Sequence, residues 1–232
     1  RRAENQPGFR VDAYSGAMSI CSAAHTHSRP LLPDIRALVC VPPSRIGETD
    51  SANAPVCCGI HPWECGAPEA ENAFRIVEDA ARAGRLSAIG ETGIDRFRRD
   101  LPVSAQVDWF RRHVRLAEET GLPLVVHCVR SESDIVGIHA SMRPRSTWTV
   151  HGCSASGAVL DGLVSRGIHA SLGPRELSRP GASDRIRRIP ADLLLLETDD
   201  SGADIREVHA TAALLLGMDP ALLRETVSCN WD

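Results

Sequence analysis

The chain has 232 residues, of which 43% are apolar and 24% are charged, and this is long enough to bury one large hydrophobic core in a single domain. A formal net charge of −4 excludes the pronounced basic excess of a dedicated nucleic-acid-binding protein, so any phosphate binding is expected to be local. No apolar run approaches the ~20 residues of a membrane span.

The eight cysteines do not indicate a disulfide scaffold. The chain is large, it shows no signal peptide, and several cysteines lie inside apolar runs, so buried free thiols are expected. The sequence contains no CxxC pair, which excludes a zinc ribbon and a thioredoxin-like motif. We therefore expect a soluble, cytoplasmic protein that does not associate with membranes.

Residues 1–17 are polar and aperiodic and include Pro7, Gly8 and Gly16, which predicts an N-terminal leader outside the folded domain. Beyond them, apolar segments recur with turn residues at their ends, and each segment is predicted to be a β-strand. The eight predicted strands are Met18–Ala24, Ala37–Val41, Val56–Ile60, Leu86–Ile89, Leu122–Val126, Thr147–Val150, Ile168–Leu172 and Asp192–Leu196.

Helices are predicted between the strands from the third strand onward. Val107, Phe110, Val114 and Ala117 follow the spacing of three and four residues that marks one helix face, and Gly121 is a helix stop before the next strand. Strands that alternate with helices indicate a parallel sheet, and eight strands indicate closure into a barrel. We therefore predict an α/β fold, a (β/α)8 TIM-like barrel over residues 18–232.

The first two connections are too short for ordinary crossover helices. Residues 28–36 include two prolines, and residues 42–55 are rich in proline, glycine and serine. The first two outer helices are therefore predicted to be missing or vestigial, which fits a chain shorter than the ~250 residues typical of this fold.

Ionisable side chains follow six of the predicted strands at their carboxyl ends: His25, His27, His61, Glu91, His127, His151 and Asp199. In a barrel these ends converge on one face, so residues far apart in the chain come within coordination distance. A single histidine at such a position would more often be an ordinary core or surface residue, but seven coincident positions favour a metal centre. Imidazole and carboxylate groups are the usual ligands of Zn and Mn, and two such ions about 3.5 to 4 Å apart would support hydrolysis.

Other features of the sequence narrow the reaction class. His113, His139, His169 and His209 lie away from the strand ends, and no chemistry is assigned to them. The chain contains no GxSxG elbow, P-loop or HExxH motif, which excludes serine hydrolases and P-loop NTPases.

Six motifs, in order across residues 18–200, resemble those of the TatD-type metal-dependent deoxyribonucleases of the amidohydrolase superfamily. The motifs are AHTHS at His25 and His27, CGIHPW at His61, AIGETGID with Glu91 and Asp95, LPLVVHC ending near His127, TVHGCS at His151 and LLLLETD ending at Asp199. The resemblance is specific because it joins six separate motifs in one order.

The resemblance implies a set of roles. His25, His27, Glu91 and Asp199 would hold one divalent metal ion, and Glu91, His127 and His151 would hold a second, so that Glu91 bridges the two ions. The ions would be Zn, Mn or Mg, and Asp199 would also orient the attacking water. By the same resemblance, His61 would contact a substrate phosphate. Independently of it, Trp63 directly follows the His61 motif and is a candidate to stack on a base at the barrel mouth, and Asp95 and Arg130 are two further candidate substrate contacts.

Departures from the family pattern gather around the substrate. Ala23 replaces the acidic residue that the family places two positions before the first metal-binding histidine, and Val129 stands where an arginine is usual, with Arg130 displaced by one. In the sixth motif Cys153 replaces an aromatic residue and Ala155 a glycine. The metal ligands themselves are all present.

These observations predict a two-metal phosphodiesterase or deoxyribonuclease that acts on DNA ends or single strands. One alternative is another metal-dependent ester or amide hydrolase, for example a D-aminoacyl-tRNA deacylase. A second is a TatD-like subunit of a multi-protein bacterial defence assembly, with a protein partner on the surface left by the missing helices near residues 28–55.

Overall fold

The computed structural model describes residues 21–27, 34–49 and 55–231. The predicted leader at residues 1–17 lies outside the described residues, as do the first residues of the predicted strand at 18–24 and most of the first connection. Among the described residues, no helix is long and apolar enough to cross a membrane.

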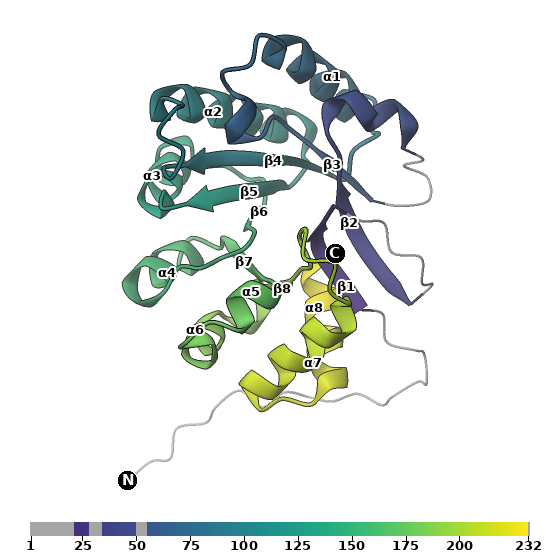
Figure 1. The fold of residues 1–232 in the computed structure, drawn as a ribbon, viewed down its shortest axis with the longest axis vertical. Helices are drawn as coiled ribbons and strands as arrows, with labels where there is room; N and C mark the ends of the chain where they lie inside the picture. Colours follow the sequence, from purple (N-terminus) through teal and green to yellow (C-terminus); the bar gives the residue numbers. More distant parts are fainter. Residues whose placement is uncertain (1–20, 28–33, 50–54, 232) are drawn as a thin grey trace.

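Eight parallel strands follow one another in chain order around a barrel (Figure 1). They are β1 (Cys21–Thr26), β2 (Ile35–Cys40), β3 (Val56–Cys58), β4 (Ala88–Asp95), β5 (Leu124–Val129), β6 (Trp148–Val150), β7 (His169–Leu172) and β8 (Leu194–Leu196). A parallel bridge between Thr26 and Asp199 joins the last strand to the first, and the amides of Thr198 and Asp199 both donate to the carbonyl of His25 at 3.2 Å. The predicted TIM-like barrel is confirmed.

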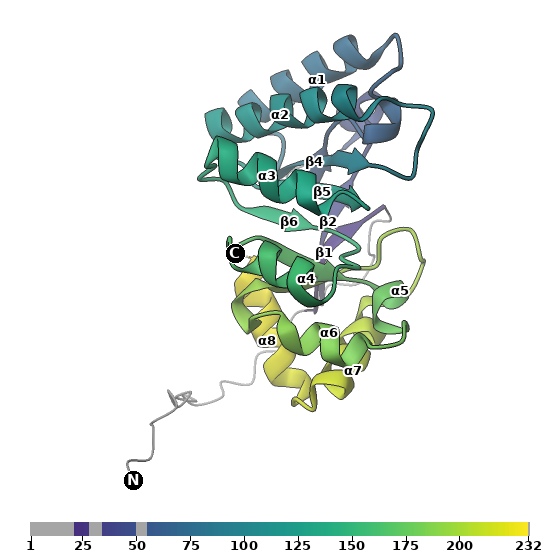
Figure 2. The same cartoon turned by 90° about the vertical axis from the view of Figure 1, so that its left-hand side faces the viewer.

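Helices cover the outside of the strands. They are α1 (Ala70–Arg82), α2 (Val103–Thr120), α3 (Glu132–Met142), α4 (Gly157–Val164), α5 (Pro174–Leu177), α6 (Ala182–Arg188), α7 (Ile205–Leu216) and α8 (Pro220–Trp231), with short 3-10 helices η1 (Pro43–Glu48), η2 (Pro62–Glu64) and η3 (Ala191–Leu193). Figure 2 shows α1, α2 and α3 stacked along one part of the barrel and α4 to α8 along the rest. In the described part of the second connection, η1 stands where a crossover helix would be.

Helix α2 shows how the sequence pattern becomes packing. Phe110, Val114 and Ala117, three residues of the predicted apolar face, are completely buried against the barrel. The helix ends at Gly121, whose φ of 72° is left-handed and whose amide donates to the carbonyl of Ala117 at 2.8 Å. The predicted helix and its glycine stop are confirmed.

A small buried cluster packs separately from the main hydrophobic core. It consists of Leu38, Cys40, Cys57, Ala88 and Val125. All cysteines in the chain are free, and only Cys229 is exposed. The expected buried thiols are therefore present.

Three strands extend further than predicted, and this moves several polar residues from loops into the sheet. His25 lies within β1, Glu91 and Asp95 within β4, and His127 within β5. The prediction ended each strand where the apolar run ended. The backbone pairing continues beyond that point, however, and pairs Gly93 with His127.

Candidate metal centre

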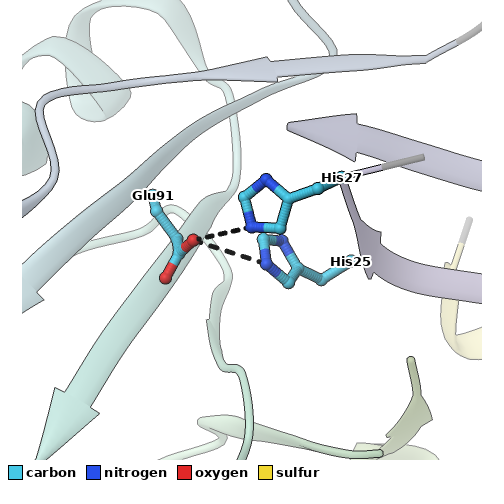
Figure 3. A group of neighbouring side chains, drawn as sticks. All are labelled: His25, His27 and Glu91. Atoms are coloured by element: carbon cyan, nitrogen blue, oxygen red, sulfur yellow. Dashed lines mark ion pairs between the residues drawn. The ribbon is translucent and has the colours of Figure 1, made fainter. Parts of the chain in front are cut away.

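All seven side chains predicted to converge at the carboxyl ends of the strands do so. His25 and His27 come from the end of β1, Glu91 from β4 and His127 from β5, while His61, His151 and Asp199 follow β3, β6 and β8. Figure 3 shows His25 and His27 pointing toward the same carboxylate oxygen of Glu91.

Two glycines place Glu91 in the mouth of the barrel. Gly90 and Gly93 have φ of 147° and 150°, a region that side chains rarely adopt. A Cβ atom would lie 2.5 Å from the carbonyl oxygen of Val125 at Gly90 and 2.0 Å from that of His127 at Gly93. The glycines thus let β4 shift its register against β5 between Ile89 and Thr92, around Glu91.

One carboxylate oxygen of Glu91 faces the first group of ligands. Nε2 of His25 lies 3.4 Å from Oε2 of Glu91 and 3.3 Å from Oδ1 of Asp199. Nε2 of His27 lies 3.5 Å from each of the same two oxygens. His25, His27 and Glu91 therefore form one group that could hold a metal ion, and Asp199 joins His25 in another group with His151.

The other oxygen of Glu91 faces a second group. Oε1 lies 2.5 Å from Nε2 of His151, 3.0 Å from Nδ1 of His127 and 3.6 Å from Nε2 of His61. The two oxygens of the Glu91 carboxylate therefore face two separate sets of imidazole nitrogens.

Positive partners hold the acids of the site in their charged form. Burial acts to raise the pKa of Glu91, but the charge of His151 and hydrogen bonds from the surrounding histidines keep that pKa well below its usual range. Hydrogen bonds from His25 and then His27 likewise hold the pKa of Asp199 far below its ordinary value. Hydrogen bonds to Asp199 and Glu91 raise the pKa of His27 to about 9.

The spacing of the first group suits a divalent cation. Metal–ligand bonds of about 2.0–2.2 Å in a tetrahedral arrangement place neighbouring ligand atoms roughly 3.3–3.6 Å apart, and the distances from His25 and His27 to the two carboxylates, 3.3–3.5 Å, lie inside that range. Nε2 of His25 is buried and lies 3.4 and 3.3 Å from carboxylate oxygens of Glu91 and Asp199, so it faces the point where a cation would bind. The side chains present therefore fit a metal ion.

Outer partners orient two of the histidines. Nδ1 of His25 lies 3.0 Å from the sulfur of Cys40, and Nε2 of His127 lies 3.4 Å from Asp95. Such contacts fix which ring nitrogen carries the proton and which faces the metal. Behind His151, Nδ1 lies 3.7 Å from Glu197, which is beyond hydrogen-bond length.

Cys40 and Glu197 also lie beside the ligands, although neither was predicted from the sequence. Glu197 is 1% exposed, and its Oε1 accepts a hydrogen bond from the amide of Gly152 at 2.6 Å. Its position in the ETD motif, two residues before Asp199, was the available signal. Cys40 could not be identified from the sequence, because a cysteine within an apolar run resembles any other buried thiol.

His61 is oriented by its own backbone. The amide of Trp63 donates to Nδ1 of His61 at 3.2 Å, so Nδ1 is an acceptor and Nε2 of the neutral ring carries the proton. That N–H points toward Glu91 and His127. It is suited to donate to a substrate oxygen, although His61 also lies close enough to Glu91 and His127 to join a metal-binding group.

Asp95 was predicted to contact substrate, yet it is 2% exposed and both its oxygens have partners inside the protein. Oδ2 accepts from the indole nitrogen of Trp63 at 2.7 Å and lies near His127, while Oδ1 accepts from the amide of Phe97 at 2.8 Å. This arrangement favours a positioning role for Asp95.

The remaining predicted contacts lie at the rim. Trp63 is 51% exposed and its ring lies 4.7 Å from that of His61. Arg130 is exposed just beyond β5, with a left-handed φ of 53°. The other four histidines lie elsewhere: His113, His139 and His209 are in helices, and His169 begins β7.

Comparison with known proteins identifies relatives that share this sequence pattern. The model of the TatD related DNase family matches residues 45–225. The uncharacterized metal-dependent hydrolase YcfH of Escherichia coli K12 is 28% identical over 203 residues, which cover 80% of this chain and 74% of that protein. The 3'-5' ssDNA/RNA exonuclease TatD of Pantoea sp. is 30% identical over 156 residues, which cover 65% of this chain and 59% of the exonuclease.

Some relatives are matched over a smaller part of their length. The deoxyribonuclease Tat-D of Schizosaccharomyces pombe is 27% identical over 131 residues, which cover 55% of this chain and 42% of that protein. The uncharacterized metal-dependent hydrolase BU355 of Buchnera aphidicola is matched over 57% of its length. The chain thus spans about half the length of these two relatives.

Solved structures share the fold. YJJV, a TatD homolog from Escherichia coli K12, superposes with a TM-score of 0.77 at 18% identity, covering 92% of this chain and 97% of the other. A TatD family hydrolase from Entamoeba histolytica gives 0.70 at 15% identity, covering 84% and 82%. The family match extends over most of the chain and includes all the converging residues except His25 and His27, so this chain belongs to the TatD related DNase family.

Proposed function

We propose that this protein is a two-metal-dependent phosphodiesterase that hydrolyses nucleic acid at ends or in single strands. The observation that carries the proposal is that the two carboxylate oxygens of Glu91 face different histidines. Oε2 faces His25 and His27, and Oε1 faces His127 and His151. A carboxylate arranged in this way is suited to bridge two cations.

The ligand sets follow from that division. His25, His27, Glu91 and Asp199 would hold one divalent ion, and Glu91, His127 and His151 the other, with Zn, Mn and Mg as the candidate ions. When bound, the ions would supply Lewis-acid stabilisation of charge on the phosphoryl oxygens and activate water near neutral pH.

The protein's own groups would perform the remaining steps. The Asp199 side chain is 38% exposed and ionised, so it can orient a water molecule and accept its proton. Nε2–H of His61 can donate to a phosphate oxygen, and the exposed ring of Trp63 beside it can stack on the adjoining base. Arg130, exposed just beyond β5, can supply local positive charge for a phosphate.

Names among the relatives support a nucleic-acid substrate. The Pantoea protein is named a 3'-5' ssDNA/RNA exonuclease and the Schizosaccharomyces protein a deoxyribonuclease. A protein partner near residues 28–55 stays a prediction, because that surface lies partly outside the described residues.

The proposal is tested by loading the protein with Zn, Mn or Mg and measuring turnover of three substrates. These are a single-stranded oligodeoxynucleotide, a D-aminoacyl-tRNA and bis(p-nitrophenyl) phosphate. We expect cleavage of the oligonucleotide and of the small diester. Turnover of the D-aminoacyl-tRNA alone would overturn the nuclease proposal in favour of deacylation.

A further inference from the structure

Two exposed aromatic side chains at the rim of the barrel each lie beside a guanidinium group. Trp63 is 51% exposed and Phe97 is 65% exposed. The guanidinium carbon of Arg98 lies 5.2 Å from the centre of the Trp63 ring, and that of Arg130 lies 5.2 Å from the centre of the Phe97 ring.

Both residues are linked to the metal centre through one buried carboxylate. Asp95 accepts from the indole of Trp63 and from the backbone amide of Phe97, and it also contacts His127. The Trp63 ring lies 6.1 Å from that of His127. The Phe97 ring contacts no described histidine of the centre, so Phe97 lies further out along the rim than Trp63.

The two arginines differ in how their charge is matched. Arg98 forms a two-pronged hydrogen bond with Asp100 at 2.9 and 2.7 Å. Arg130, by contrast, forms no ion pair with any described residue, and its guanidinium lies over the face of Phe97. A left-handed φ of 53°, costly for a residue with a side chain, accompanies this position.

An exposed aromatic ring beside a guanidinium without an ion pair can bind one nucleotide of a strand. The ring offers a face on which an unpaired base can stack, and the guanidinium can bind the phosphate that follows it. A base inside a duplex has both faces covered by its neighbours and cannot stack on a protein ring. Two such units in succession would therefore favour a single strand over a duplex.

We propose that Phe97 and Arg130 form a second nucleotide-binding unit, next to the Trp63 unit, that makes the enzyme select unpaired strands. This inference rests on the proposed nuclease function. Trp63, beside His61, would take the base nearest the cleaved phosphate, and Phe97 would take the next base along the strand.

The test compares one large and one small substrate. Phe97→Ala should lower kcat/KM for a single-stranded oligonucleotide roughly 5- to 30-fold more than for bis(p-nitrophenyl) phosphate, as expected from losing one base stack. Phe97→Trp should restore the difference, because it keeps an aromatic face. An oligonucleotide with an abasic site at the second nucleotide should be cleaved equally well by the wild type and Phe97→Ala.

The contribution of Arg130 is measured by the salt dependence of cleavage. Arg130→Ala should flatten the dependence of log(kcat/KM) on log salt concentration by about 0.7 for the oligonucleotide, the slope of one lost phosphate contact on a single strand. Arg187→Ala is the matched control, because Arg187 is exposed on the outer helix α6 and forms no ion pair with a described residue. Its salt slope should equal that of the wild type.

The outcomes separate the two proposals. If the wild type cleaves the oligonucleotide and Phe97→Ala loses activity equally on both substrates, the second unit does not exist. An undiminished preference for single strands over duplex in Phe97→Ala would lead to the same conclusion. If the wild type cleaves neither substrate with any metal, the proposed function itself fails, and this inference fails with it.

Discussion

Asp95 and His127 meet on the side of the imidazole ring that faces away from Glu91. Oδ2 of Asp95 lies 3.4 Å from Nε2 of His127, while Nδ1 of the same ring lies 3.0 Å from Oε1 of Glu91. A proton held on Nε2 by Asp95 leaves the lone pair of Nδ1 available to a metal ion. The contact therefore connects the rim, which Asp95 also anchors, to the ligand set.

Asp95→Asn should weaken metal binding. The two oxygens of Asp95 accept from the indole of Trp63, the amide of Phe97 and the ring of His127, and the amide group of asparagine would present a donor to at least one of them. We expect affinity for the second ion to fall about 10- to 100-fold, measured by competition with a chromogenic chelator. Asp108→Asn, on the exposed face of α2, is the control and should bind as the wild type does.

Glu91→Gln should remove at least one metal ion and most of the activity. The substitution keeps the shape of the side chain but removes the charge that offsets repulsion between two cations about 4 Å apart. Elemental analysis after reconstitution with Zn or Mn should fall from two equivalents to one or fewer, and turnover should drop more than about 100-fold. Two bound ions and unchanged turnover would refute the bridging role.

The control for that experiment should be Glu225→Gln rather than a change at His113. In the sequence, His113 lies away from the predicted ligands, so its substitution would be expected to leave metal binding unchanged. In the structure it is completely buried and accepts a hydrogen bond from the amide of Ile60 at 2.9 Å, directly before His61. His113→Ala would therefore disturb folding and the position of His61 together. Glu225 is exposed on α8, far along the chain from every ligand.

Metal binding should raise the stability of the folded protein. The ligand set is assembled only when β1, β4, β5 and the residues after β6 and β8 are in place, so the ions should bind the folded state in preference to the unfolded chain. A free metal concentration of about 100 times Kd should add about 2.7 kcal/mol, observed as a higher Tm and reversed by a chelator. Glu91→Gln should show a clearly smaller shift, and an equal shift would mean that the ions bind elsewhere.

The stability of the metal-free protein should fall in mild acid through His113. Burial lowers the pKa of His113 to about 4, below its ordinary value of 6.5, so between these two values the unfolded chain binds a proton that the folded protein does not. The contribution of His113 is present above about pH 6.5 and is lost as the pH falls toward 4, by roughly 2–3 kcal/mol.

Urea unfolding with a chelator present tests this contribution. The free energy of unfolding would be compared near pH 7.5 and near pH 4.5 for the wild type and His113→Gln. Glutamine can accept the hydrogen bond from Ile60 but does not titrate. The drop in unfolding free energy should be smaller in the variant by about 2 kcal/mol. Identical drops would assign the pH dependence to other groups.

The sequence by itself determined the barrel and the convergence of the ligands. Alternating strands and helices leave few topologies, and a closed parallel barrel brings every strand end to one mouth, so His25 and Asp199 could be placed together without coordinates. Strand ends were less accurate, because polar ligands such as Glu91 interrupt the apolar pattern while the backbone pairing continues.

Only the tertiary structure decided how the side chains divide their contacts. The two oxygens of Glu91 face different histidines, Cys40 contacts His25, and Asp95 is buried instead of lying at the surface. These contacts depend on strand register and on side-chain rotamers. Together they set the distances between residues of different elements to within tenths of an ångström. Sequence periodicity reports only which face of its own element a residue occupies, and so it carries no information about the partner on the other side.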